Sequence, residues 1–370
     1  MQKGSLKSAE LVIAFATSHY SHEYSTLLNA LSEVTGTENI VGCSSVGVLT
    51  AEGEIEGSIS LSLLAIEGVK ATPFLASVDE KEPGAIIGKV VKQLEREASP
   101  GDTALLLADP LNVDVVGLIG AIQNGLPGVS LIGGVASTMS IPPRTYQWAG
   151  KEVTSAGVAG VVFPKGLRAH TGVAQGCKPI GRPYVVTSAQ ANVVLEIGNL
   201  PATQVLREAV ESIPQDEAKK APGSIFCGIA IDERIYPLEQ GDFLIRHMVG
   251  ADEKYGAIAI GDLISAGQTV QFQMREAQSA RNALLHTLGK LSEDEAASKA
   301  AFGLYFNCLG RGEGLYGMPH HDTGLISSIF PNVPVAGFFG NAEIGPVHKK
   351  NALHTYGGVL ALFSSEEESA

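Results

Sequence analysis

The sequence has few charged residues and few cysteines, and each shortage narrows the class of protein to which it belongs. Only 18% of its 370 residues are charged, whereas aliphatic residues and glycine are abundant, so the composition favours a compact α/β protein over a disordered chain. The cysteines, Cys43, Cys177, Cys227 and Cys308, include no CxxC pair, which argues against a zinc site or a redox motif. No export signal is recognised, so we expect four free thiols.

Positive charge and long apolar runs are also scarce. The formal net charge is -13 and no basic cluster offsets it, so the chain would repel a phosphate backbone and we expect no nucleic-acid partner. The first apolar run stops at Ala16 without a cleavage pattern, and no later stretch stays apolar for the ~18 residues of a membrane span. These features predict a soluble cytoplasmic protein without membrane contact.

The length predicts two domains, because 370 residues exceed the size of one ordinary hydrophobic core. A polar stretch, PQDEAKKAPGS, begins at Pro214 and is typical of a linker. We therefore expect an amino-terminal α/β domain over residues 1–212, a linker over 213–223 and a carboxy-terminal α/β domain over 224–370.

Three segments repeat one plan of strand, helix, second strand and returning strand. The first strands begin near Leu11, Thr103 and Phe302, and each second strand runs into small residues, in IVGCSS, LIGGVAS and VAGFFGN. The interval from first strand to glycine is similar each time, with 31 residues from Leu11 to Gly42, 28 from Leu105 to Gly133 and 33 from Leu304 to Gly337. The expected fold class is α/β, a two-domain mixed-sheet protein with repeated β-α-β-β units.

The segment between the second and third copies carries further strand and helix patterns. They predict a hairpin over Tyr184 to Ile197, a helix opened by Pro201, strands at 225–231, 243–249, 256–260 and 269–274, and a helix over 277–289.

Several motifs in a fixed order resemble one known family. VGCSSVG, LIGGVAS, GVAQGCKPIG, VVTSAQANVVLEIGNLPA, DFLIRHMVGADEKYGAIAIGD, NCLGRGEGLYG and VAGFFGNAEIGPV followed by LHTYGGVLAL are similar to the FIST family, the F-box and intracellular signal transduction domains. The resemblance covers nearly the whole chain. It implies a sensory module that binds small ligands such as amino acids. The chain carries no kinase, methyl-accepting or F-box segment, so its output would pass through a separate signalling protein.

The candidate ligand site combines glycine-flanked loops with short polar groups. Asn341 and Glu343 offer an amide and a carboxylate, a pair suited to the ammonium and a polar group of an amino acid, and Arg311 offers a guanidinium for a carboxylate. The predicted ligand-binding residues are Cys43, Ser44, Ser45, Gly134, Ser137, Thr138, Gln175, Cys177, Arg246, Cys308, Arg311, Asn341 and Glu343. Each has a structural alternative: Glu343 would brace backbone, the hydroxyls would serve turns, and Arg311 would form an ion pair with Glu313.

Catalysis is the competing function. Cys308 stands three residues before Arg311, which would lower the pKa of the thiol and make it a nucleophile, as in a hydrolase. His320, His321 or His354 would supply a base, although no spacing places any of them at Cys308. A buried, unreactive thiol is the more common case, so an enzyme is the lesser hypothesis. A scaffold that only contacts proteins is the third.

Neither a cofactor nor a metal is expected. Gly312, Gly314 and Gly317 form a GxGxxG, but Pro319 interrupts the helix that a dinucleotide site requires, and Gly337 stands where an acid would hold the ribose. Asp322 is expected to cap a helix beginning at Thr323 rather than to bind a metal with its neighbouring histidines. The ligand, the partner and the oligomeric state stay open.

Overall fold

The computed structural model describes residues 9–214, 217 and 223–365, which form two compact units. Unit 1 comprises Met1–Val173, Leu285–Leu353 and Gly358–Ala370, and unit 2 comprises Ala174–Leu284 and His354–Gly357. The sequence predicted two consecutive domains, 1–212 and 224–370. Each compact unit instead combines separate stretches of the chain, so its bounds differ from those of the predicted domains. Within the expected linker, residues 215–216 and 218–222 lie outside the described residues.

Unit 1 repeats one arrangement three times: a strand, a helix, a second strand parallel to the first, and a return strand antiparallel to the first. The copies are β1 (Leu11–Thr17), α1 (Tyr24–Thr35), β2 (Ile40–Ser45), β5 (Leu61–Ile66); β7 (Thr103–Ala108), α3 (Val115–Gly125), β8 (Ser130–Val135), β11 (Gly157–Val162); and β22 (Phe302–Cys308), α9 (His321–Ile329), β23 (Val335–Gly340), β26 (Gly357–Ser365). The predicted α/β class with repeated units is confirmed.

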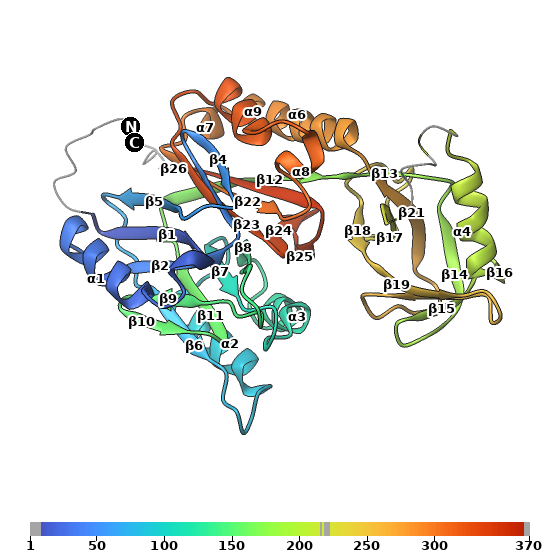
Figure 1. Ribbon diagram of the computed structural model, residues 1–370, viewed down its shortest axis with the longest axis horizontal. Helices are drawn as coiled ribbons and strands as arrows, with labels where there is room; N and C mark the ends of the chain where they lie inside the picture. The colour runs from blue at the N-terminus through green and yellow to red at the C-terminus, as the bar shows by residue number, and fades with distance from the viewer. Residues whose placement is uncertain (1–8, 215–216, 218–222, 366–370) are drawn as a thin grey trace. The chain divides into compact units, whose positions relative to one another are not determined.

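The copies also exchange strands in a cycle, which the sequence did not reveal. The strand that follows each second strand joins the sheet of another copy: β3 (Gly47–Thr50) pairs β23, β24 (Ala342–Val347) pairs β8, and β9 (Gln147–Ala149) pairs β2. Each brings a hairpin partner, namely β4 (Gly53–Glu56), β25 (Lys350–His354) or β10 (Glu152–Thr154). Figure 1 shows the blue β4 in the same sheet as the orange β23. Each sheet is therefore completed by another copy.

The three matching glycines lie within strands rather than in loops. A β-carbon at Gly42 would stand 1.7 Å from the carbonyl oxygen of Ala14, and one at Gly337 would stand 1.8 Å from that of Tyr305. Gly133 meets the Leu106 carbonyl in the same way, at 1.9 Å. In each copy the glycine faces its register partner on the parallel first strand. The expectation of loop glycines was wrong, because close strand approach requires them.

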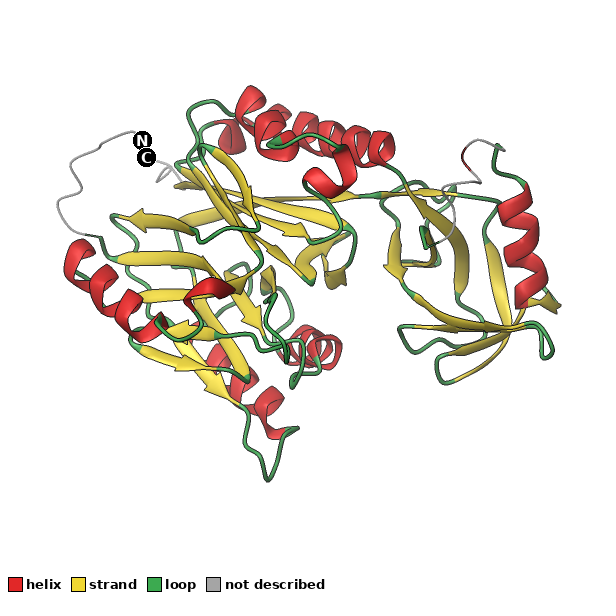
Figure 2. Ribbon diagram, viewed as in Figure 1, coloured by secondary structure: helices red, strands yellow, loops and turns green. Residues whose placement is uncertain are grey.

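Alternation along the first strands divides the core of unit 1 into layers. On β1, Ile13 and Phe15 face a shared interior with residues of β7 and β22, whereas Val12 and Ala14 face α1. In the shared interior the rings of Phe15 and Phe338 lie 4.8 Å apart between centroids. The helices, among them α2 (Ala85–Glu97), lie on the outer faces of the sheets, as Figure 2 shows for α1 and α9. Strand β6 (Phe74–Ser77) also belongs to unit 1, and β12 (Leu167–Gln175) begins in unit 1 and ends in unit 2.

Unit 2 is built on a separate sheet, ordered β18-β17-β21-β14-β15-β20-β19. Its elements are β13 (Cys177–Pro179), β14 (Tyr184–Gln190), β15 (Val193–Ile197), β16 (Leu200–Pro201), α4 (Ala202–Glu211), β17 (Ile225–Ala230), β18 (Phe243–Arg246), β19 (Met248–Asp252), β20 (Ala257–Ile260) and β21 (Thr269–Arg275). The predicted hairpin is β14 and β15. The strand expected over 243–249 is broken, since β18 ends at Arg246 and β19 begins at Met248. Helix α6 (Ala277–Glu293) follows the last strand and α7 (Glu295–Ser298) comes next.

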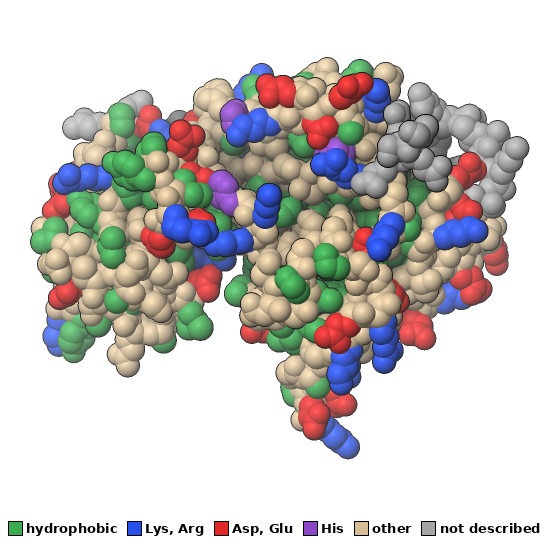
Figure 3. All heavy atoms as spheres, turned by 180° about the vertical axis from the view of Figure 1, so that it is seen from behind, with side chains coloured by type: hydrophobic (Ala, Val, Ile, Leu, Met, Phe, Trp, Pro, Cys, Tyr) green, Lys and Arg blue, Asp and Glu red, His purple; other side chains and the backbone are tan. Residues whose placement is uncertain are grey.

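The surface carries charges of both signs. Figure 3 shows acidic and basic side chains interspersed on one face of the molecule. No helix in the described part of the chain combines the length and the hydropathy that crossing a membrane requires.

Candidate functional site

The ends of the three second strands meet in unit 1. Ser137 donates its backbone N–H to the Ser44 carbonyl at 3.2 Å and its hydroxyl to the Phe339 carbonyl. Asn341 donates its side-chain amide to the Ala136 carbonyl at 2.6 Å. The copies are therefore joined through these polar groups.

Most of the predicted loop groups bond to neighbouring protein atoms. Ser44 Oγ accepts from Tyr146 N at 2.9 Å, and the hydroxyls of Thr138 and Ser140 share a hydrogen bond of 2.9 Å. Ser45 Oγ is buried and has no hydrogen-bond partner among residues 9–214, 217 and 223–365. Cys43 packs in the shared core, while Gly134 of β8 and the buried Glu343 of β24 are register partners. A ligand contact for these residues stays a prediction.

Beyond the end of β22, Arg311 forms a buried ion pair with Asp322. Arg311 Nε lies 2.9 Å from Asp322 Oδ2, and the two side chains are 1% and 0% exposed. Burial alone would lower the pKa of Arg311 and raise that of Asp322, but the mutual attraction reverses both shifts, so both groups stay charged. The alternative pairing with Glu313 was wrong, because Glu313 is exposed and Asp322 holds the guanidinium.

Asp322 collects hydrogen bonds from several elements. Its Oδ2 accepts from the Tyr305 hydroxyl at 3.0 Å and the Asn307 amide at 3.2 Å, and its Oδ1 lies 3.0 Å from His321 Nδ1. Arg311 Nη2 in turn donates to the Tyr316 hydroxyl at 2.7 Å. We call the set of Glu54, Tyr305, Asn307, Arg311, Tyr316, His321 and Asp322 the Arg311 cluster.

Glu54 provides the helix cap that the sequence assigned to Asp322. Helix α9 begins at His321, and Glu54 Oε1 accepts from the backbone N–H of Asp322 at 2.8 Å and of Thr323 at 3.0 Å. Glu54 comes from β4, the hairpin strand supplied by the first copy. Burial raises the pKa of its carboxyl, against the lowering effect of the Thr323 hydrogen bond. Asp322 was wrongly predicted as the cap, because a residue far away in sequence takes that role.

Three buried atoms of the Arg311 cluster remain without a hydrogen-bond partner among the described residues. They are Arg311 Nη1, Asn307 Oδ1 and Glu54 Oε2, and their residues are 1%, 0% and 6% exposed. One is a charged donor and two are acceptors. An unmet buried polar group costs about 1–3 kcal/mol, so each of these atoms calls for a partner.

The remaining predicted residues fall in two places. Cys308 is buried at the end of β22, in register with Gly340, and its Sγ accepts from Gly310 N at 3.5 Å. Gln175, Cys177 and Arg246 belong to unit 2 rather than unit 1. There Arg246 Nε lies 2.5 Å from Asp262 Oδ2, Gln175 donates its amide to the Phe243 carbonyl, and Cys177 is in register with Arg275.

Sequence reasoning missed most of the Arg311 cluster. Tyr305 and Asn307 stand in the run FGLYFNC, where a polar residue ending a buried strand is a usable signal. Glu54 gave no signal, because only the strand exchange brings it to α9.

These features define an α/β protein of three interlocked copies with a buried charged cluster beside the strand ends. In a comparison with known families, residues 10–199 match the FIST N domain and residues 202–346 match the FIST C domain. An uncharacterized protein of Mycobacterium bovis is 33% identical over 362 residues, 98% of this chain and 92% of its own length. One of Mycobacterium tuberculosis is 34% identical over 357 residues, 95% of this chain and 91% of its own.

The chain belongs to the FIST family, as its motifs indicated. FIST domains are consistent with a sensory role in signal transduction.

Proposed function

We propose that this protein is a cytoplasmic sensor that binds an amino acid or a similar polar metabolite at the Arg311 cluster. The observation that supports it is the set of three buried atoms without hydrogen-bond partners among the described residues, Arg311 Nη1, Asn307 Oδ1 and Glu54 Oε2. A guanidinium donor suits a carboxylate, and the two acceptors suit an ammonium. Family membership supports the sensory role.

The ion pair preorganises the Arg311 guanidinium as a hydrogen-bond donor. Asp322 and Tyr316 occupy Nε and Nη2, so the guanidinium orientation is set before a ligand arrives. A ligand therefore loses little free energy to ordering this side chain. The proposed output is a contact with a separate signalling protein.

A thermal-shift screen over amino acids and related carboxylic acids tests the proposal, because a ligand that binds only the folded state raises the melting temperature. The key variant is Glu54→Gln, which keeps an oxygen for the α9 cap and replaces the second acceptor by a donor. We expect it to lose the shift caused by the hit. Glu56→Gln is the matched control, since Glu56 is exposed on the same strand and accepts from Glu313 N.

Two results would overturn the proposal. One is a screen without any stabilising compound, and the other is a hit whose shift is equal in wild type and Glu54→Gln. A turnover that disappears in Cys308→Ser would instead favour the cysteine hydrolase, and a copurifying protein without any ligand response would favour the scaffold.

A further inference from the structure

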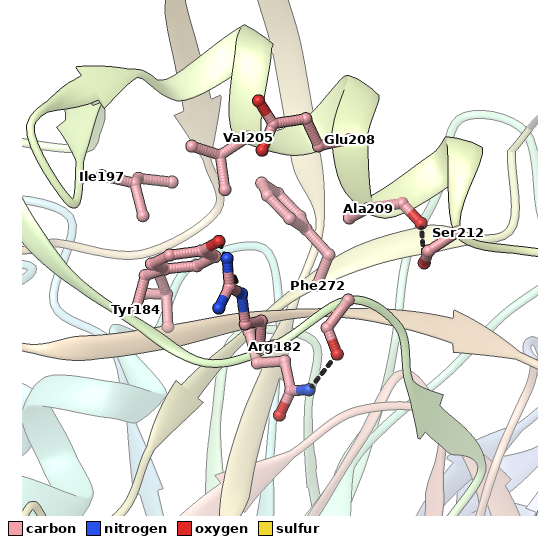
Figure 4. A pocket seen from close by; sticks show the side chains of 11 residues that line it. Arg182, Tyr184, Ile197, Val205, Glu208, Ala209, Ser212 and Phe272 are labelled. Carbon is pink, nitrogen blue, oxygen red and sulfur yellow. Dashed lines mark hydrogen bonds between the residues drawn. The ribbon is translucent and has the colours of Figure 1, made fainter.

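Unit 2 contains a pocket between helix α4 and the sheet, of about 240 Å³. It is lined by residues of α4, β14, β15 and β21 and by the loop that carries Arg182. We call it the α4 pocket. Figure 4 shows Phe272 between the helix and the Arg182 and Tyr184 side chains.

The inner wall of the α4 pocket is apolar. Ile197, Val205, Ala209, Val270 and Phe272 are all buried and belong to one core cluster. They come from β15, α4 and β21, so regular elements hold the wall in place. Such a surface suits a hydrocarbon or aryl group of a few carbons.

The exposed Arg182 side chain lines the pocket and carries a positive charge. Arg182 Nε donates to the Tyr184 hydroxyl at 2.9 Å, and the guanidinium carbon stands 5.3 Å from the centre of the Tyr184 ring. The terminal nitrogens of Arg182 make no hydrogen bond or ion pair with the part of the chain that the structure describes. They form a planar pair of donors, the geometry that a carboxylate matches.

The loop that carries Arg182 is held beside the pocket. The Gln271 side-chain amide donates to the Gly181 carbonyl at 3.0 Å. Gly181 has φ +64°, and a β-carbon there would stand 3.0 Å from that of Ala209 on α4. The loop therefore passes close to the helix, and only glycine fits this conformation without strain.

A carboxylate on α4 narrows the choice of ligand. Glu208 lines the pocket, and its Oε1 accepts from the Gln204 amide at 2.9 Å. A ligand with a second negative charge would face this carboxylate, whereas a ligand with one carboxylate and an apolar body would not.

We propose that the α4 pocket binds a small monocarboxylate with an apolar body, an aryl or branched alkyl carboxylic acid. The carboxylate pairs with the terminal nitrogens of Arg182, and the apolar body packs on Val205 and Phe272. This site belongs to unit 2, and its residues are not those of the Arg311 cluster, so the inference does not rest on the proposed function.

Titration calorimetry of the full chain with phenylacetate tests the inference, with 4-methylpentanoate, adipate and neutral phenylacetamide as comparisons. We expect both monocarboxylates to bind, and adipate and phenylacetamide to bind at least about tenfold more weakly. Arg182→Gln should weaken phenylacetate binding at least about tenfold, and Glu208→Gln should narrow the gap between adipate and the monocarboxylates. Arg207→Gln is the matched control, because Arg207 is an exposed arginine of α4 that pairs with Glu253 and does not line the pocket.

Arg182 is exposed, so its replacement should leave the melting temperature unchanged, and this is checked first. The inference is overturned if phenylacetate does not bind the wild type, or if it binds Arg182→Gln as tightly. Retained phenylacetate binding in Glu54→Gln would show that the α4 pocket acts independently of the Arg311 cluster. Loss of binding in that variant would contradict the assignment to this pocket.

Discussion

At the scale of single residues, Asp322 is the group on which the Arg311 cluster depends. Its carboxylate accepts from Arg311, Tyr305 and Asn307 while fully buried. Such a pair adds little stability over an apolar one, but breaking it leaves a charge alone in the interior. Replacing one partner should therefore lower the stability of the protein much more than replacing both by apolar residues.

We predict that Asp322→Asn lowers the free energy of unfolding by about 3–5 kcal/mol, because Arg311 loses its counter-charge. Urea unfolding measures the change. The exposed Glu313→Gln is the control and should change stability by less than about 0.5 kcal/mol. The double variant Arg311→Met with Asp322→Leu should cost less than the sum of its two single variants. Additive costs would contradict a coupled pair.

The depressed pKa of Asp322 also predicts that stability depends on pH. Although burial opposes it, Arg311 holds the pKa of Asp322 below its ordinary value of 3.8, so protons bind the unfolded state more readily. The stabilisation is fully present above about pH 5 and is lost as the pH falls below 3.8 towards the depressed folded pKa. The stability difference between wild type and Asp322→Asn should therefore be constant from about pH 5 to 7 and shrink in acid. A difference that grows in acid would contradict this sign.

At the scale of elements, the close approach of parallel strands explains the glycine shared by the three copies. Gly337 of β23 faces the Tyr305 carbonyl of β22, and this backbone group cannot move aside as a flexible side chain could. The sequence showed the glycine at similar intervals but not its cause. Gly337 therefore allows β22 and β23 to pair closely and does not serve a flexible loop.

We predict that Gly337→Ala destabilises the protein by at least about 3 kcal/mol or prevents folding, since a β-carbon would stand 1.8 Å from a carbonyl oxygen. Gly324→Ala is the matched control, because Gly324 lies in α9 and a β-carbon there meets nothing within 4 Å. That change should be neutral or stabilise by up to about 1 kcal/mol. Thermal and urea unfolding compare the two. Equal effects would disprove the close-approach explanation.

At the scale of the whole molecule, strand exchange makes the three copies of unit 1 depend on one another. β8 pairs with β24 and β3 pairs with β23, so residues 1–173 contain β3 without β23 and β8 without β24. Unpaired strand edges and an open core face would then be exposed. Cooperative folding should require all three copies.

We predict that a fragment of residues 1–173 does not form a cooperatively folded state. It should lack the near-ultraviolet circular dichroism of the full chain and should aggregate. Adding a fragment of residues 285–370 restores the missing strands and is expected to recover part of the signal. A fragment of 1–173 that melts cooperatively by itself would contradict the interdependence of the copies.

The sequence by itself determined the α/β class, the three copies and most helix and strand positions, because these follow from local hydrophobic periodicity and from glycine and proline signals. It also placed Arg311 among the candidate residues. The tertiary structure alone decided that Asp322 is the partner of Arg311 and that Glu54 caps α9. Glu54 and Asp322 are 268 residues apart, and only a strand crossing into another copy's sheet brings them into contact.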